Sequence, residues 1–225
     1  MNFKSLIYSI LTPSRNIIDR NTYELFRELF IDCNHILNVG SASDTILGAD
    51  FWSVISPTSK LTTLDINPNS GADLICDVVN MPISDSVFDL VVCQASAEHF
   101  EDIDSALFEI KRVTKIGGYV YFTVPFLQGY HADPFDFRRY TLQGFINLVD
   151  LPCVHHGVSS GPFSVISWVL RDLFSFGLHG SLLYKLSRLI SSLLFVPISY
   201  LDYIFPRTLS YSRNACEYFY LFRNN

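Results

Sequence analysis

A dense group of polar side chains lies in the segment Val124–Thr141, VPFLQGYHADPFDFRRYT, directly after an apolar run. Its imidazole, His131, is of the side-chain type that titrates nearest neutral pH, which makes it a candidate for accepting a substrate proton. The two guanidinium groups of Arg138 and Arg139 could bind a phosphate or carboxylate through paired hydrogen bonds. The alternative is a loop that Asp–Arg pairs hold in front of a helix capped at Thr141.

A second candidate site combines a glycine turn with a carboxylate further along the chain. The stretch His35–Ser43, HILNVGSAS, predicts a buried strand that ends in a tight turn at Gly40, where backbone and ligand can approach closely. Asp65 closes the next apolar run 25 residues later, as expected of a carboxylate that binds the ribose hydroxyls of an adenosine-type ligand. The alternative is a turn aspartate that bonds its own backbone in the sequence DINP.

The elements that must position these residues alternate between strands and helices. Further strands are predicted at Leu61–Asn69, 72–77, Ser86–Ser96 and Tyr119–Phe126, with helical segments over 1–34 and 45–54 and a crossover helix over Asp104–Val113 that Gly117 and Gly118 end. This order predicts a doubly wound, mostly parallel α/β sheet, in which ligands bind beyond the carboxyl ends of the strands. The residues expected at those ends are Gly40, Asp65, Asp77, Gln94 and Pro125.

The last third of the chain completes the expected Rossmann-like αβα sandwich. A helix is predicted over Thr141–Leu148, a strand over Cys153–Val158, and a final strand over Ala215–Arg223 that forms an antiparallel pair at the sheet edge, giving about seven strands. We therefore expect four segments: a helical cover over 1–34, a core over 35–160, an apolar helical insertion over 161–210, and a final edge strand within 211–225.

The insertion, Phe163–Phe205, is rich in apolar residues. Its longest apolar core, Leu189–Leu201, is too short for a spanning helix and is interrupted by serines and a proline. One prediction is an amphipathic hairpin in the membrane interface, with Lys185 and Arg188 at the lipid head groups. The alternatives are a helical cover over an acceptor pocket or the face of a homodimer.

Composition narrows the function classes. Residues 1–150 hold 10 Lys and Arg against 19 Asp and Glu, whereas residues 151–225 hold 6 against 3, and the whole chain carries a net charge of −6. This acidity argues against a nucleic-acid partner. The five widely spaced cysteines and the absence of a convincing N-terminal cleavage site predict a cytoplasmic protein with reduced thiols and no metal site. The apolar, mildly basic last third of the chain adds the expectation of a location at the inner face of the membrane.

The motifs ILNVGSAS, LDINP, CDVVNMPISDSVFDLVVCQASAEHFED and LFEIKRVTKIGGYVYFTVP follow one another along the chain. Through them, residues 36–126 resemble the class I S-adenosylmethionine-dependent methyltransferases, specifically the ubiquinone-methyltransferase-like group. The resemblance implies S-adenosyl-L-methionine as cofactor. It also implies that the methionine part of the cofactor lies near Asn38, Gly40, Ser41 and Gln94, the ribose near Asp65, and the adenine near Ile66, Asp77 and Val78.

One motif departs from this family. Where the family has Gly-x-Gly-x-Gly, this chain has Gly40 followed by Ala42 and Asp44. The departure leaves open a scaffold protein of the same fold that has lost tight cofactor binding and serves a polysaccharide-synthesis or membrane partner. A nicotinamide-dependent oxidoreductase is less favoured, because the turn lacks the glycines that admit a pyrophosphate.

The segment Val124–Thr141 is similar to one found in a subgroup of these methyltransferases that accompanies cell-surface polysaccharide or glycolipid synthesis. This second resemblance implies methyl transfer to an oxygen of a small-molecule, sugar or glycolipid acceptor. We expect His131 to act as the general base. The residues expected around the acceptor are His99, next to Glu98, and Asp136, Arg138 and Arg139.

Overall fold

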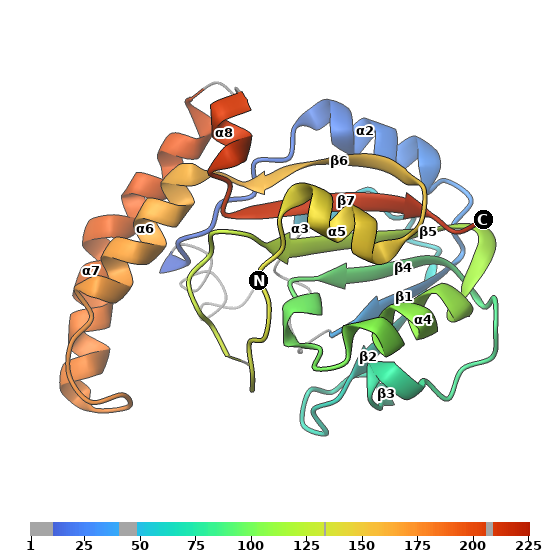
Figure 1. Cartoon of the computed structure of the whole chain (residues 1–225), viewed down its shortest axis with the longest axis horizontal. Helices are drawn as coiled ribbons and strands as arrows, with labels where there is room; N and C mark the ends of the chain where they lie inside the picture. Colours follow the sequence, from blue (N-terminus) through green and yellow to red (C-terminus); the bar gives the residue numbers. More distant parts are fainter. Residues whose placement is uncertain (1–10, 41–48, 133, 206–208) are drawn as a thin grey trace. The chain divides into compact units, whose positions relative to one another are not determined.

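The computed structural model describes residues 11–40, 49–132, 134–205 and 209–225, which contain a seven-stranded sheet (Figure 1). Its strands are β1 (His35–Val39), β2 (Lys60–Asp65), β3 (Leu74–Ile75), β4 (Phe88–Gln94), β5 (Thr114–Pro125), β6 (Cys153–Ser160) and β7 (Glu217–Arg223). They lie in the order β3-β2-β1-β4-β5-β7-β6. The helices are α2 (Arg20–Leu29), α3 (Ala49–Trp52), α4 (Ile103–Val113), α5 (Leu142–Val149), α6 (Pro162–Leu173), α7 (Leu182–Ser199) and α8 (Leu209–Arg213), with 3₁₀ turns η1 (Val78–Asn80), η2 (Ala97–His99) and η3 (Tyr200–Tyr203).

Strands β1 to β5 pair in parallel, β7 runs antiparallel to β5, and β6 runs antiparallel to β7. The pairs β1–β2, β1–β4, β2–β3 and β4–β5 are all parallel. Strand β7 is antiparallel to β5, because Gly117 N donates to Asn224 O while Phe126 N donates to Cys216 O. The Rossmann-like, mostly parallel sheet is confirmed. The final strand, however, lies inside the sheet between β5 and β6, so the edge position expected for it belongs to β6.

The chain divides into two compact units, which we describe separately. The core unit comprises Asp19–Pro125, His131–Gly157 and Phe219–Asn225, and the hairpin unit comprises Met1–Ile18, Phe126–Tyr130 and Val158–Tyr218. The core unit contains β1 to β5 and most of β6 and β7. The hairpin unit contains α6, α7 and α8.

Both faces of the sheet in the core unit are covered by helices. Tyr121 and Phe122 are neighbours on β5 and therefore point to opposite faces. On one face Tyr121 packs against Phe26 of α2 and Phe51 of α3, with ring centroids 5.6 and 4.2 Å away. On the other face Phe145 of α5 lies 5.1 Å from Phe122, and Figure 1 shows α4 and α5 in front of the strands. The sheet is thus doubly wound, as expected.

The boundary between α4 and β5 differs from the prediction. Helix α4 ends at Val113, and Gly117 and Gly118 lie within β5 instead of ending the helix. The register between β4 and β5 shifts at this point, and Gly117 has a φ of +80°. A Cβ on Gly118 would lie 2.9 Å from the carbonyl oxygen of Asp89. The two glycines therefore form a bulge that brings two backbones close together.

Helix α2 is capped by Asp19, whose side chain accepts a hydrogen bond from Thr22 N. Aspartate is a favoured capping residue, because its carboxylate satisfies one of the first backbone amides of the helix.

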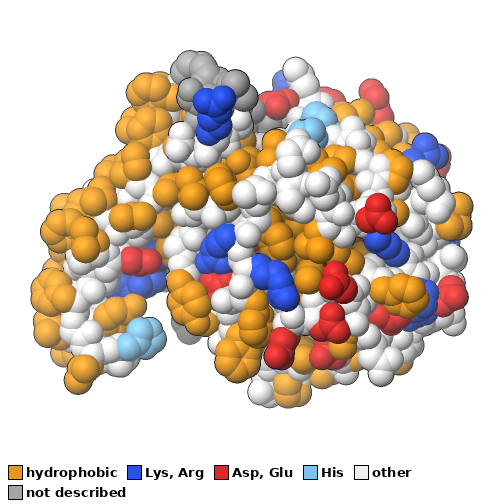
Figure 2. All heavy atoms as spheres, viewed as in Figure 1, with side chains coloured by type: hydrophobic (Ala, Val, Ile, Leu, Met, Phe, Trp, Pro, Cys, Tyr) orange, Lys and Arg blue, Asp and Glu red, His pale blue; other side chains and the backbone are white. Residues whose placement is uncertain are grey.

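The hairpin unit has polar side chains on the inside and apolar ones on the outside. The buried residues of α7 are Ser187, Ser191, Ser192, Val196 and Ser199. Its exposed apolar residues follow a helical stripe: Leu182, Leu183, Leu186, Leu189, Ile190, Leu193 and Leu194. Figure 2 shows apolar side chains gathered over α6 and α7.

Asp202 of η3 holds the start of α6. Its carboxylate accepts hydrogen bonds from Phe163 N, Ser164 N and Ser164 Oγ at 2.9, 2.8 and 2.6 Å, and from Tyr211 Oη at 2.7 Å. The N-cap of α6, Gly161, has no side chain to satisfy the first amides, and Asp202 does so from a distant part of the chain.

One described helical segment, Leu182–Tyr203, is long and apolar enough to cross a membrane, with 22 residues, a mean hydropathy of 1.3 and 28% of the window buried. The segment begins before the apolar core Leu189–Leu201, so the expectation of a run too short to span does not hold for the helix as folded. The more specific feature of this segment is the side-chain pattern of α7, with buried serines and an exposed apolar stripe.

Candidate functional site

The parallel strands bring four predicted ligand-binding residues to one edge of the sheet in the core unit. Gly40 follows β1, Asp65 ends β2, Asp77 follows β3 and Gln94 ends β4. Asn38, one residue before the end of β1, is 7% exposed. The carboxyl ends of parallel strands share an edge, so these groups border one region, as the sequence predicted. Ser41, with Ala42 and Asp44, lies outside the described residues.

The turn at Gly40 depends on the absence of a side chain. Its φ is +71°, and a Cβ at this position would lie 2.7 Å from both Cβ and Oγ of Ser96. The Ser96 hydroxyl donates to Val39 O at 3.1 Å and to Gln94 O at 3.0 Å, which joins the ends of β1 and β4. Sequence reasoning missed Ser96, although a small polar residue just after a buried strand is a usable signal. The space beside Gly40 is therefore filled by this serine.

Asp65 has the turn role that the sequence offered as one of two alternatives, and it keeps the capacity for the other. It is 8% exposed, and its Oδ1 accepts a hydrogen bond from Asn67 N at 2.8 Å, which forms the turn in DINP. A carboxylate has a second oxygen and further lone pairs, so the turn does not use up its capacity to bind a ribose. The next residue, Ile66, is 61% exposed and offers an apolar surface beside it.

Asp77 and Val78 differ in their exposure. Asp77 is exposed, and its Oδ1 accepts from Val79 N at 3.2 Å, which caps η1. The Val78 side chain is buried, with 6% exposure. Of this pair, only Asp77 therefore presents its side chain to the surface.

The polar cluster after β5 is organised around Asp136. Both of its oxygens pair with the guanidinium of Arg139, and Oδ2 also accepts from His131 N at 2.8 Å. Burial raises the pKa of Asp136, but the bonds from Arg139 and His131 outweigh it and hold the pKa below its usual range. Arg138 donates to the carbonyl oxygens of Phe100 and Glu101. The segment is thus a loop held in part by an Asp–Arg pair, which was the alternative interpretation of these residues.

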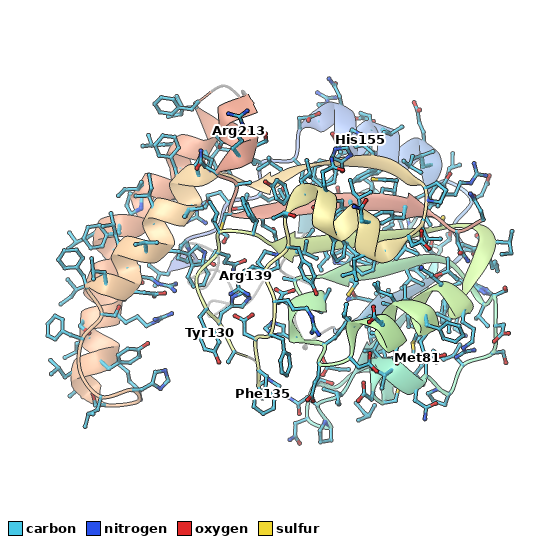
Figure 3. All side chains as sticks on the ribbon, in the orientation of Figure 1. Met81, Tyr130, Phe135, Arg139, His155 and Arg213 are labelled. Carbon is cyan, nitrogen blue, oxygen red and sulfur yellow. The ribbon has the colours of Figure 1, made fainter. Side chains whose placement is uncertain are left out.

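Two histidines converge on a buried carboxylate at the mouth of this loop. Glu98 of η2 is 0% exposed. Its Oε1 lies 3.4 Å from His131 Nε2 and 3.9 Å from His99 Nε2. Figure 3 labels Phe135 and Arg139 on the same loop, at the end of the sheet where β4 and β5 finish. Sequence reasoning placed Glu98 at the border of the acceptor and did not anticipate that its carboxylate is enclosed.

Two buried thiols of the core unit, those of Cys33 and Cys93, are structural. Burial raises the pKa of Cys93 to about 12, and it raises the pKa of Cys33 to about 12 as well. All five cysteines are free. A thiol with such a pKa is neutral at physiological pH and is a poor nucleophile.

The sequence comparison identifies a domain within the core unit. Residues 43–122 match the family model described as "Methyltransferase domain". No curated protein matches the chain. The matched range begins three residues after Gly40, extends into β5 and includes Asp65, Asp77 and Gln94.

Solved structures share the fold at low sequence identity. A putative sarcosine dimethylglycine methyltransferase from Galdieria sulphuraria is 13% identical, with a TM-score of 0.57 over 91% of this chain and 86% of that one. Phosphoethanolamine N-methyltransferase 2 from Haemonchus contortus, solved with S-adenosyl-L-methionine, is 15% identical, with a TM-score of 0.53 over 91% and 52%. The [4+2]-cyclase SpnF is 14% identical, with a TM-score of 0.56 over 91% and 80%. The match to the methyltransferase-domain model covers residues 43–122, and the solved structures show that this chain shares their fold.

Proposed function

We propose that this protein transfers a methyl group from S-adenosylmethionine to an oxygen of a small-molecule, sugar or glycolipid acceptor. The observation that carries the proposal is the arrangement of Gly40, Asp65 and Gln94 along one edge of a parallel sheet, within or next to the range that matches a methyltransferase domain. Two carboxylates on this edge, Asp65 and Asp77, favour a cationic cofactor.

The reaction requires alignment and the removal of one proton. Methyl transfer is an in-line displacement at the sulfonium methyl, so the protein mainly holds the acceptor oxygen at near-contact distance. An alcohol must lose its proton in the course of the transfer. We assign the proton transfer to the group formed by Glu98, His99 and His131, because both ring nitrogens of His131 face carboxylates, with Nε2 3.4 Å from Glu98 and Nδ1 3.7 Å from Asp136.

Calorimetric titration with S-adenosylhomocysteine and, separately, with NADH tests the cofactor. We expect binding of S-adenosylhomocysteine alone. Binding of neither ligand would support the scaffold alternative, and binding of NADH alone would support an oxidoreductase. Transfer of a labelled methyl group to candidate sugars and glycolipids then tests the acceptor class. The same assay on a His131→Ala variant tests the histidine. An unchanged turnover number in this variant would show that His131 takes no part in the chemistry.

We further propose that the outer face of the hairpin unit contacts lipid at the inner surface of the membrane. In a helix that packs against a protein core, apolar residues face inward and polar residues face water. Helix α7 has the reverse pattern, with buried serines and an exposed stripe of leucines. Small residues between helices and large apolar ones outside are typical of helices that pack within lipid.

Binding to anionic phospholipid vesicles tests the lipid contact. Replacing Leu189, Leu193 and Leu194 by serine is expected to abolish co-sedimentation, because each side chain is at least 46% exposed and would lose its apolar contact with lipid. The matched control is Phe108→Ser and Ile116→Ser in the core unit, which removes apolar side chains that are more exposed than the three leucines and is expected to leave binding unchanged. A full-length chain that does not bind vesicles but forms dimers would support the dimer face instead.

A further inference from the structure

Glu98 poses an energetic problem that its protein neighbours do not solve. The side chain is 0% exposed, and neither carboxylate oxygen has a hydrogen-bond partner among the described residues. An ionised carboxylate that is buried without a partner costs several kcal/mol in free energy. A cation at this position would remove that cost.

The neighbouring imidazole of His99 is oriented as a ligand. Its Nδ1 lies 2.5 Å from the carbonyl oxygen of Phe135. A carbonyl oxygen can only accept, so Nδ1 carries the proton and a neutral ring has its lone pair on Nε2, the nitrogen that faces Glu98. Metal-binding histidines are commonly fixed in this way, with the other ring nitrogen bonded to a backbone carbonyl.

We propose that Glu98, His99 and His131 bind a divalent transition-metal ion between the ends of β4 and β5. One ligand atom from each residue lies within 4.8 Å of the other two. At metal–ligand distances of about 2.1 Å, ligands of one ion are separated by roughly 3 to 4.2 Å. The separations of 3.4 and 3.9 Å from Glu98 Oε1 fall in this range. Two imidazoles and one carboxylate suit zinc, manganese, iron or cobalt better than magnesium or calcium.

Such a site would leave coordination positions open for an acceptor. Three protein ligands do not fill the coordination sphere of these ions, and a bound hydroxyl loses its proton more readily because the metal stabilises the oxyanion. The activation of an acceptor hydroxyl by the metal rests on the proposed methyl transfer. With the ion bound, His131 would be a ligand instead of accepting the proton itself as in the metal-free route, and the acceptor hydroxyl would lose its proton to solvent.

Isothermal titration calorimetry of the full chain with ZnCl₂ and with MnCl₂, after removal of metal by a chelator, tests the site. We expect one site per chain and a rise in Tm with metal. Glu98→Gln, which keeps the shape of the side chain, is expected to weaken binding by about 100-fold or more. The matched control is His35→Gln, which removes an exposed imidazole at the opposite end of β1 and should leave binding unchanged.

Two results would overturn the proposal: no metal binding by the wild-type chain, or equal binding by wild type and Glu98→Gln. The first would leave Glu98 as the partner of a protonated His131. If circular dichroism shows that Glu98→Gln does not fold, His99→Gln takes its place. His99 is half-buried, so its substitution is expected to destabilise the fold less than that of the fully buried Glu98. Binding of S-adenosylhomocysteine measured on the same samples distinguishes failure of the metal site from failure of the proposed function.

Discussion

Gly40 is the residue at which the turn after β1 is most sensitive to change. Two independent requirements meet there, a φ of +71° and a Ser96 side chain that occupies the place of a Cβ. The first requirement is a backbone preference and the second is steric. A glycine elsewhere in the core unit, Gly71, has only the first, with a φ of +76° and nothing within 4 Å of the added Cβ.

Gly40→Ala is therefore expected to lower the free energy of unfolding by more than Gly71→Ala. The backbone cost of about 1–2 kcal/mol is common to both variants, and displacement of Ser96 adds to it at Gly40 alone. Chemical denaturation of both variants measures the difference. Equal losses would show that Ser96 moves aside without cost.

A substitution at Asp65 separates its structural role from its proposed binding role. In Asp65→Asn the amide oxygen can still accept from Asn67 N, so the turn should persist and stability should change little. The loss of the charged acceptor is expected to weaken binding of S-adenosylhomocysteine by about tenfold or more. Calorimetry measures the affinity. The control is Asp73→Asn, an exposed carboxylate bonded to Thr63, and unchanged affinity in Asp65→Asn would remove Asp65 from the cofactor site.

At the scale of elements, one carboxylate of α4 holds the end of η1 against the helix. Glu109 accepts from Met81 N at 2.8 Å and pairs with Arg112 at 2.7 Å. The hydrogen bond from Arg112, followed by the one from Met81, holds the pKa of Glu109 below its usual value in spite of burial. A carboxyl whose pKa is lowered by folding stabilises the fold above its ordinary pKa and loses that contribution as the pH falls.

Glu109→Gln is expected to cost about 1–3 kcal/mol in free energy of unfolding at pH 7. The difference from wild type should shrink as the pH falls from about 5 toward 3, because the wild-type carboxyl is then protonated as well. Urea denaturation of both proteins across this range measures it. A difference that does not vary with pH would mean that the charge of Glu109 does not contribute.

In the hairpin unit, Asp202 has a role like that of Glu109, because its carboxylate accepts backbone hydrogen bonds from a distant segment of the chain. Asp202→Ala removes the acceptor of four hydrogen bonds and leaves the first amides of α6 without a partner inside the unit. We expect a loss of about 3 kcal/mol or more, seen as faster hydrogen exchange in α6. The exposed Asp104→Ala in the first turn of α4 is the control. Unchanged exchange in α6 would contradict the assigned role.

How far the sequence predicts these elements depends on the range of the interactions that form them. Strands β1 and β4 are predictable because an apolar run that ends in a small or polar residue is a local pattern. The position of β7 between β5 and β6 is not, because it depends on pairing between Gly117 and Asn224, which are far apart in the chain. The same holds for the site: Asp65 follows from spacing, whereas the enclosure of Glu98 depends on His131 arriving from another loop.

At the scale of the whole molecule, the two units are interleaved in the sequence. The hairpin unit takes segments from before β1, after β5 and between β6 and β7. The composition shift seen in the sequence, acidic before residue 150 and apolar and basic after it, follows this division only in part, since Phe219–Asn225 returns to the core unit. A chain cut at one point would therefore not yield two intact units.

The junction between β6 and β7 has an evolutionary consequence. The segment 161–215 leaves the sheet after Ser160 and returns at Cys216, and Cys216 N donates to Ser160 O at 2.9 Å, so its two ends are already neighbours. An insertion whose ends meet can be gained or lost without rethreading the strands around it. If a turn of four residues replaced the insertion, the entropic cost of closing the connection between β6 and β7 would fall by roughly 2 kcal/mol.

Replacing residues 161–215 by an Asn-Gly-containing turn is thus expected to give a chain that still binds S-adenosylhomocysteine within about threefold of wild type but no longer sediments with vesicles. Calorimetry and co-sedimentation measure the two properties on one sample. Loss of both together would show that the hairpin is part of the catalytic body. Loss of vesicle binding alone would identify the hairpin as a separable attachment, one that lineages could exchange to direct the same chemistry to a different surface.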